Sequence, residues 1–403
     1  MIIRFLILII FTSSCSQFVN RLDDDLFINE SIPYKEDNRQ MSCDQNDSLQ
    51  LISRNNSGHT KFLKFINDNE FTYIEKVVFW TFVQMNLNPH LSSPTGSAQF
   101  ILNEDTYLEV SAQETNRTPI FYGLQKLLTK FKNKRNLKEL ARVFDRNYPN
   151  SFYVSQSFAT YLSQNKEKIL NNKVLTRNFV RAQDTLRENE RIPKQNFSLL
   201  IKRNKDSDYN SKSFTDFKKF KDYYCNFDIK NYLAGSFTPQ SELVKANVFG
   251  IKVGSNSIVI SLSTNTDEVQ NYDRSIFITG KNTNQNSYVC LVKKQDKYLW
   301  VIGSGSRDPG QQVSQMLAIS TKLDRQTIIR TLKVPRYIRL ADPNRLILES
   351  EKATNDEIES LQDLKIPLYS TGSIGNLTTY ISTPQTKSFF LDLRSPGKLV
   401  CGK

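Results

Sequence analysis

Apolar residues recur every three or four positions from His59 to about Asn210, which is the spacing of one buried face of an α-helix. Thr72 followed by Glu75 predicts a capping box at the start of one helix. Pro119 after Thr118 suits the first turn of another helix. Two further helices are expected from apolar stripes at Leu137, Leu140, Val143 and Phe144, and at Phe158, Tyr161, Leu162 and Ile169. The pattern predicts a helical domain over residues 59–202.

The apolar period changes to two from about Val244, which is typical of β-strands. Helices are expected after Asp308-Pro309 and, capped by Thr354 with Glu357, near residues 355–364. Strands are expected at 248–253, 257–262, 275–279, 288–292, 298–302, 328–329, 337–338, 346–348, 377–382 and 389–393. Residues 244–403 therefore predict a mixed α/β layered domain, and the polar residues 203–243 predict a linker. The expected fold class is an α+β multidomain protein with a helical N-terminal domain.

The first residues have the pattern of an export signal. Arg4 precedes an apolar run from Phe5 to Phe11, and small residues then lead to Cys15. The run is too short to span a bilayer, so residues 1–15 predict a lipoprotein signal peptide with Cys15 as the lipidated residue. An ordinary secretory signal with a chance cysteine is the alternative. Residues 16–58 are polar and predict a tether, and Ser16 favours the outer membrane of a cell envelope.

The net charge of the chain indicates which kinds of partner it can bind. The chain of 403 residues carries 54 basic and 41 acidic residues, a formal charge of +13. Residues 124–146 hold eight basic residues against Glu139 and Asp145, and residues 164–222 hold fifteen against eight. Such stretches are usually solvated helix faces, but they also suit nucleic acid or an anionic envelope polymer.

The numbers of cysteines and histidines limit which disulfides, metal sites and catalytic groups the chain can form. Cys43, Cys225, Cys290 and Cys401 follow the signal, so an exported chain is expected to form at least one disulfide in one of three pairings. The alternative for Cys290 is a small core residue. The two histidines, His59 and His90, are expected at the surface, and they are too few for a histidine metal site or a Ser-His-Asp triad.

One short segment resembles a lytic enzyme. Residues 86–100, NLNPHLSSPTGSAQF, resemble the segment after the catalytic glutamate of lysozyme-like lytic transglycosylases. Gln84 stands where that family has its acid, five residues before Pro89. Because an amide cannot protonate a glycosidic oxygen, this resemblance does not imply transglycosylase activity.

A longer resemblance covers residues 247–393. Its segments are Val253 to Ser257, Asn286 to Leu291, Leu299 to Gly303, Lys333 to Pro335, Leu346 to Ser350, Ile358 to Leu364, Ile366 to Thr371 and Gly375 to Thr378. Together they resemble the metallo-β-lactamase-like domain of ComEC-type DNA-uptake proteins. The family's metal-bridging aspartate is replaced by Ser304, and its histidine pair by Arg336 and Tyr337. These side chains are unsuited to holding two divalent cations, so we expect a degenerate hydrolase-like domain with no metal and no cofactor.

A binding role is the function expected for such a chain. Ser304, Arg307, Arg336, Tyr337 and Arg339 are the candidate anion-binding residues, with no catalytic residue assigned. The loop from Ser304 to Gly310 is alternatively a simple capped turn. The leading expectation is a non-catalytic, membrane-anchored envelope lipoprotein that acts as a binding or assembly module, a pseudoenzyme. The alternatives are a basic DNA- or anionic-glycan-binding protein and a cell-wall or metal-dependent hydrolase with a rebuilt site.

Overall fold

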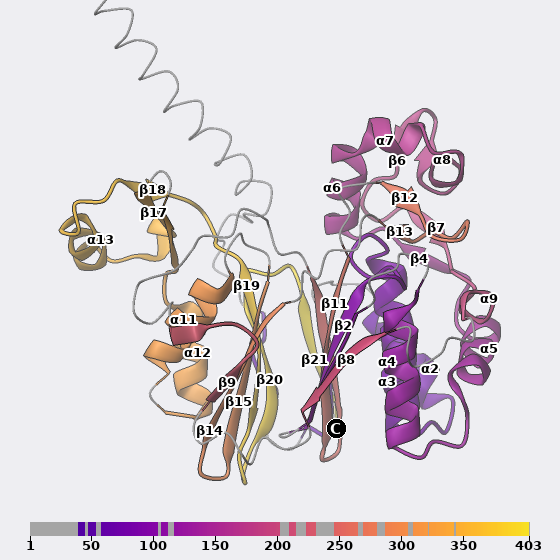
Figure 1. Ribbon diagram of the computed structural model, residues 1–403, viewed down its shortest axis with the longest axis horizontal. Coiled ribbons are helices and arrows are strands. Elements are labelled where there is room, and N and C mark those ends of the chain that lie inside the picture. The colour runs from indigo at the N-terminus through magenta and orange to yellow at the C-terminus, as the bar shows by residue number, and fades with distance from the viewer. Residues whose placement is uncertain are drawn as a thin grey trace, which may run out of the picture.

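The computed structural model describes residues 39–44, 47–53, 58–103, 106–111, 117–201, 209–214, 223–230, 246–264, 269–279, 287–304, 309–320, 322–341 and 344–402. Two sheets lie between two layers of helices (Figure 1). The signal peptide with Cys15, most of the predicted linker, and Arg307 lie outside the described residues. The chain is a mixed α/β protein, as the change of apolar period indicates.

The first helical layer follows the predicted stripes. The Thr72 side chain and the Glu75 carboxylate form the expected capping box, and Pro119 occupies the first turn of its helix. The layer contains α2 (His59–Asn67), α3 (Tyr73–Leu87), α4 (Pro119–Lys130), α5 (Leu137–Asn147), α6 (Gln156–Gln164), α7 (Lys166–Leu170), α8 (Lys173–Phe179) and α9 (Phe197–Leu200). Short strand pairs join these helices: β4 (Ser151–Tyr153) with β7 (Arg191–Pro193), and β5 (Val180–Arg181) with β6 (Asp184–Thr185).

The seven-stranded sheet packs against this layer. Its order is β21-β1-β10-β11-β2-β3-β8, and each neighbouring pair is antiparallel. The bounds are β1 (Leu49–Ser53), β2 (Ser97–Leu102), β3 (Thr106–Ser111), β8 (Asn210–Phe214), β10 (Asn247–Val253), β11 (Asn256–Ser263) and β21 (Lys398–Gly402). β10 and β11 match the predicted strands, whereas the other five were not predicted.

The five-stranded sheet has the order β20-β19-β15-β14-β9 and is also antiparallel. Its strands are β9 (Tyr223–Cys225), β14 (Tyr288–Lys294), β15 (Lys297–Ser304), β19 (Asn376–Ser382) and β20 (Lys387–Leu391). The helices α11 (Pro309–Ile319) and α12 (Arg325–Lys333) cover its outer face (Figure 1). Along β15, Trp300 and Ile302 join the core between the sheets, while Leu299 and Val301 pack in the helix-side core. Burial on both faces explains the continuous apolar run of this strand.

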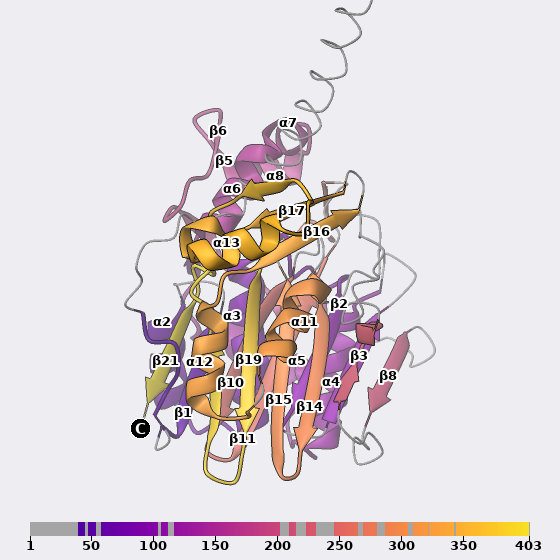
Figure 2. The ribbon, with the colours of Figure 1, turned by 90° about the vertical axis from the view of Figure 1, so that its left-hand side faces the viewer.

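A small three-stranded sheet lies beyond the ends of α11 and α12 (Figure 2). It contains β16 (Tyr337–Ala341), β17 (Asn344–Leu348) and β18 (Leu368–Ser370), with the 3-10 helix η3 (Ser350–Lys352) and α13 (Asn355–Gln362) between the last two. Gln315 of α11 accepts from the Tyr337 N–H and donates to the Tyr337 carbonyl, and Gln311 does the same for Arg339. These two amides fasten the free edge of β16 to α11. β12 (Gln270–Asn271) and β13 (Ile278–Thr279) form a separate two-stranded antiparallel sheet.

Several predicted elements and domain boundaries differ from the structure. Residues 328–329 lie in α12 instead of a strand, because Asp324 caps a helix in which Ile328 and Leu332 face the core one turn apart. The tether prediction is wrong for residues 49–53, since β1 lies between β10 and β21 in the larger sheet. The predicted boundary at 203–243 is also crossed by that sheet, because β2 pairs directly with β11.

Candidate functional site

Two of the predicted anion-binding residues, Ser304 and Arg336, contact the same segment of chain. Ser304, at the end of β15, donates from Oγ to Oδ1 of Asn376 at 3.2 Å. The Arg336 guanidinium donates to the carbonyl of Ile374 at 3.2 Å. Both residues are buried, and Arg336 is only 4% exposed. The structure therefore brings Ser304 and Arg336 to one segment, residues 374–376.

Arg336 belongs to a buried network of charges. Its guanidinium forms an ion pair with Asp392 at 2.7 Å, and its backbone N–H donates to Glu349 at 3.0 Å. Arg394 binds both carboxylates: Nε donates to Glu349 at 2.5 Å, and Nη1 lies 3.3 Å from Asp392. Lys352 lies 3.5 Å from Glu349. The network combines three cations with two carboxylates, so it carries one net positive charge.

Backbone contacts show what the network holds together. Arg394 also donates to the carbonyls of Leu332 and Val334, at the end of α12, at 2.6 and 2.8 Å. Asp392 accepts from the N–H of Leu377 in β19, and Glu349 accepts from the N–H of Ile374. The network thus joins α12, β17, β19 and the chain after β20 at the base of the small sheet.

The pKa shifts follow from burial and from the excess of cations. Burial raises the pKa of Asp392, but the adjacent Arg336 and Arg394 outweigh it and hold that pKa below its usual range. The same balance, with Arg394 as the main partner, lowers the pKa of Glu349. Burial, followed by repulsion from Arg394, lowers the pKa of Lys352 to about 8. Both carboxylates are therefore ionised at neutral pH and form ion pairs with the guanidinium groups.

These contacts separate the other predicted site residues from Arg336. Tyr337, the first residue of β16, is 36% exposed, and its backbone is bound by Gln315. Arg339 is half-buried, and its backbone is bound by Gln311. Arg336 is paired internally, so these side chains do not form one open cationic pocket. Asp392, Arg394 and Glu349, which the sequence analysis did not single out, complete the charge balance.

A second polar cluster lies where α3 meets the larger sheet. Gln84 is fully buried, and neither atom of its side-chain amide has a hydrogen-bond partner within the described part of the chain. Asn247, at the start of β10, donates to the backbone carbonyl of Gln84 at 3.3 Å and to Ser92 Oγ at 2.9 Å. The Oδ1 of Asn247 and the Nδ2 of Asn88 likewise have no partner among the described residues. These amides can hydrogen-bond a small polar molecule, but none of them is a general acid or base at neutral pH.

Both histidines are buried, which corrects the expectation that they lie at the surface. His59, in α2, has Nε2 3.3 Å from Ser53 Oγ and packs against the ring of Trp80. His90 stacks on Phe158 with ring centroids 5.2 Å apart. Residues distant in sequence enclose the two rings: Trp80 of α3 lies beside His59, and Phe158 of α6 beside His90.

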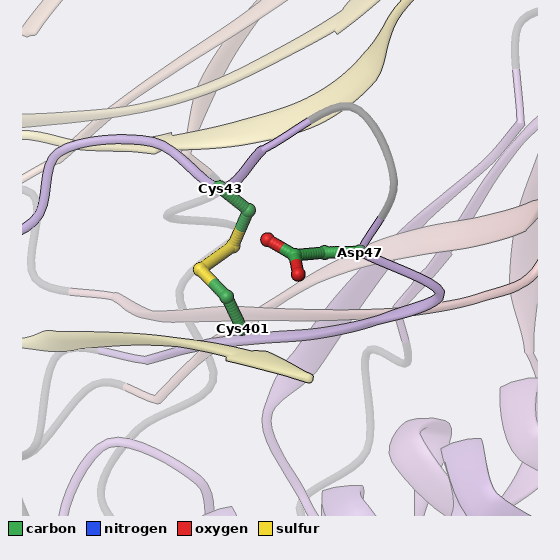
Figure 3. A group of neighbouring side chains, drawn as sticks. All are labelled: Cys43, Asp47 and Cys401. Carbon is green, nitrogen blue, oxygen red and sulfur yellow. A yellow bond between two sulfur atoms is a disulfide. The ribbon is translucent and has the colours of Figure 1, made fainter. Parts of the chain in front are cut away.

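The four cysteines form two disulfides, Cys43 with Cys401 and Cys225 with Cys290. Asp47 lies beside the first disulfide, as Figure 3 shows. This is the one grouping of three metal-type ligands that we find within the described ranges. Since metals are bound by thiolates and both sulfurs are used in a bond, the oxidised group is not a metal site.

Comparison with known proteins shows a fold relationship. No known family matches the chain, and no curated protein is similar to it in sequence. The solved structures of two forms of LmbA2991 superpose on it, with TM-scores of 0.60 and 0.57 and identities of 9% and 8%. Each comparison covers 91% of this chain and 100% of the other. At these identities the similarity concerns the fold alone.

A search of the described helices for an apolar stretch long enough to cross a bilayer finds none.

Proposed function

We propose that this protein is a non-catalytic binding or assembly module of a bacterial cell envelope, anchored through a lipid on Cys15. The proposal includes kinship of residues 247–393 with the metallo-β-lactamase-like domain of ComEC-type proteins. In support, the segments that carry the resemblance fall, in chain order, in β14, β15, β17, α13 and β19.

One observation carries the non-catalytic part of the proposal. Where the resembled family has a metal-binding aspartate and histidines, Ser304 and Arg336 are buried, and their polar groups are engaged by Asn376, Ile374 and Asp392. A two-metal hydrolase needs carboxylates and imidazoles that face a water molecule. Here the carboxylate, Asp392, faces guanidinium groups instead.

The two disulfides support the location. Structural disulfides persist in oxidising compartments and are rare in the cytosol of most bacteria. They fit a chain that leaves the cytoplasm through the signal in residues 1–15, and Ser16 favours the outer membrane. Fractionation of cells that make the wild type or Cys15→Ser tests the anchor, because only the wild type should be found with the membranes.

A hydrolysis assay tests the non-catalytic role. The purified full chain, incubated with bis(p-nitrophenyl) phosphate and with Mn²⁺ or Zn²⁺, should release no nitrophenol above the buffer rate. Murein zymography should likewise show no clearing. Phosphodiester turnover that stops on chelation and is lost in Ser304→Ala would contradict the proposal. Clearing by the wild type but not by Gln84→Ala would favour a cell-wall hydrolase.

A basic face favours DNA or an anionic glycan as a second candidate partner. Lys138, Arg142 and Arg146 are exposed and four residues apart on α5, so they form one row. Lys126 and Lys130 form a similar row at the end of α4, with Lys132 and Lys134 exposed in the turn between the helices. The exposed acidic side chain within this stretch is Glu139, whose carboxylate is engaged in the capping box of α5. We call the seven basic residues the α4–α5 basic face.

Salt dependence tests this second candidate. If the basic face binds DNA, gel retardation should show affinity falling steeply with salt, and Lys138→Gln/Arg142→Gln/Arg146→Gln should reduce the log–log slope by about 2 to 3. The control Lys297→Gln/Lys322→Gln/Lys398→Gln removes the same charge from scattered exposed positions outside both basic stretches and should change the slope by less than about 1. Equal effects of the two variants would show non-specific attraction by net charge instead.

A further inference from the structure

An apolar cavity of about 430 Å³ lies between the small sheet and α11. Ala318 and Ile319 of α11 form one wall, Val334, Pro335 and Tyr337 form the base, and Leu361 of α13 closes the far side. Of these residues only Val334 touches the charge network around Arg394, through its backbone carbonyl. The cavity is within the size range of sites that bind small molecules or single large side chains.

The cavity exists because α13 does not pack tightly onto α11. α13 is amphipathic in sequence, yet none of its residues is buried. Its Ile358 and Leu361 are half-buried, and Leu364 beyond its end is 57% exposed. On the opposite wall, Ile319 is 43% exposed. Large exposed apolar side chains are few among the described residues, so their grouping here marks a surface for contact with another molecule.

The rim of the cavity is acidic, although the protein as a whole is strongly basic. Asp356 and Glu357 line it from the first turn of α13. Residues 351–363 contain five exposed carboxylates, and their one basic residue, Lys352, is bound to Glu349. Lys333 precedes the cavity residue Val334 in sequence but does not line the cavity. A ligand that combines an apolar group with positive charge is therefore complementary to the cavity and its rim.

We propose that this cavity binds a large apolar side chain from a cationic segment of a partner protein, with Asp356 and Glu357 pairing to the flanking lysines or arginines. The proposal names the partner chemistry of the binding role proposed above and rests on that role. A peptide segment suits the surface because apolar exposure continues beyond the cavity to Leu364. A basic partner is also electrostatically complementary to the acidic rim, whose charge is opposite in sign to the net charge of the chain.

Three synthetic peptides provide the test, with the purified full chain titrated by calorimetry. In the basic probe, phenylalanine and leucine stand between two lysines; the neutral and acidic probes carry glutamine or glutamate in place of lysine. The basic probe should bind saturably, the neutral probe about fivefold more weakly, and the acidic probe not detectably, because each exposed charge pair contributes up to about 1 kcal/mol. Absence of saturable binding of the basic probe up to about 1 mM would overturn the proposal.

Matched variants locate the binding. Asp356→Asn/Glu357→Gln removes both charges, while glutamine can still close the capping box with Thr354, so the basic probe should fall to the affinity of the neutral one. Glu359→Gln is the control, since Glu359 lies on the same helix but does not line the cavity; it should change affinity by less than about twofold.

Filling the cavity gives a second readout. Ala318→Trp and Ser360→Trp occupy it from opposite walls at exposed positions, so the fold should survive, and each should weaken all probe binding by at least about tenfold. Basic-probe binding that is unchanged in both variants would overturn the proposal. A finding of catalytic turnover would contradict the non-catalytic role but leave these results unaffected, because neither Ser304 nor Arg336 lines the cavity.

Discussion

Replacing Arg394 by methionine is expected to lower the free energy of unfolding by about 3–5 kcal/mol. The substitution leaves Glu349 and Asp392 buried with one guanidinium, that of Arg336, in place of two. It also removes the hydrogen bonds from Arg394 to the carbonyls of Leu332 and Val334. Removing one partner of a buried ion pair costs the desolvation of the charge left behind, which is larger than the net strength of the pair. Urea denaturation followed by circular dichroism measures the change.

An exposed arginine provides the control for this experiment. Arg187 lies 3.5 Å from Asp184, and its side chain is 83% exposed. Arg187→Met should therefore change the free energy of unfolding by less than about 1 kcal/mol. If Arg394→Met is equally mild, the charge network does not hold the small sheet in place.

Removing the disulfide between Cys43 and Cys401 by the double change Cys43→Ser/Cys401→Ser is expected to cost about 2–5 kcal/mol. This bridge closes a loop of 358 residues and ties the segment before β1 to β21. β21 is an edge strand of the seven-stranded sheet and pairs only with β1 within that sheet. Without the bridge, we expect β21 to separate before the rest of the sheet, lowering the melting temperature and exposing the C-terminal residues to carboxypeptidase.

The second disulfide provides the comparison. Cys225–Cys290 closes a loop of 65 residues, so a chain-entropy account predicts a stabilisation smaller by about 1.5 kcal/mol. Treatment of the wild type with a reducing agent breaks both bridges, so it should lower the stability by more than Cys43→Ser/Cys401→Ser does. A double variant as stable as the oxidised wild type would show that strand pairing alone holds β21.

Local signals in the sequence identified several elements correctly. Thr72 with Glu75 and Thr354 with Glu357 form their capping boxes as predicted. β10, β11, β14 and β15 also lie where the apolar residues predict them. A capping box is complete within four residues, and a strand buried on both faces must be apolar along most of its length. Such features depend on neighbouring residues and can be derived without knowledge of the tertiary structure.

The sequence did not predict which residues surround individual polar side chains. Arg336 and Ser304 were expected at an open anion-binding surface, yet Arg336 is neutralised by Asp392, which is 56 residues away in sequence. His90 was expected in solvent and instead stacks on Phe158 of another helix. Burial of a polar side chain depends on which distant segments cover it, and a local pattern carries no information about those segments.

The sequence by itself determined the mixed α/β class, the positions of most helices and of the strongest strands, and the basic character of α4 and α5. Only the tertiary structure decided that β1 lies inside the larger sheet, where Leu49 is paired with both Val253 and Gly402. It also decided the disulfide pairing and the composition of the buried charge network. The physical reason is that strand partners, disulfides and buried ion pairs join residues far apart in the chain, and their stability depends on the packing of the whole fold.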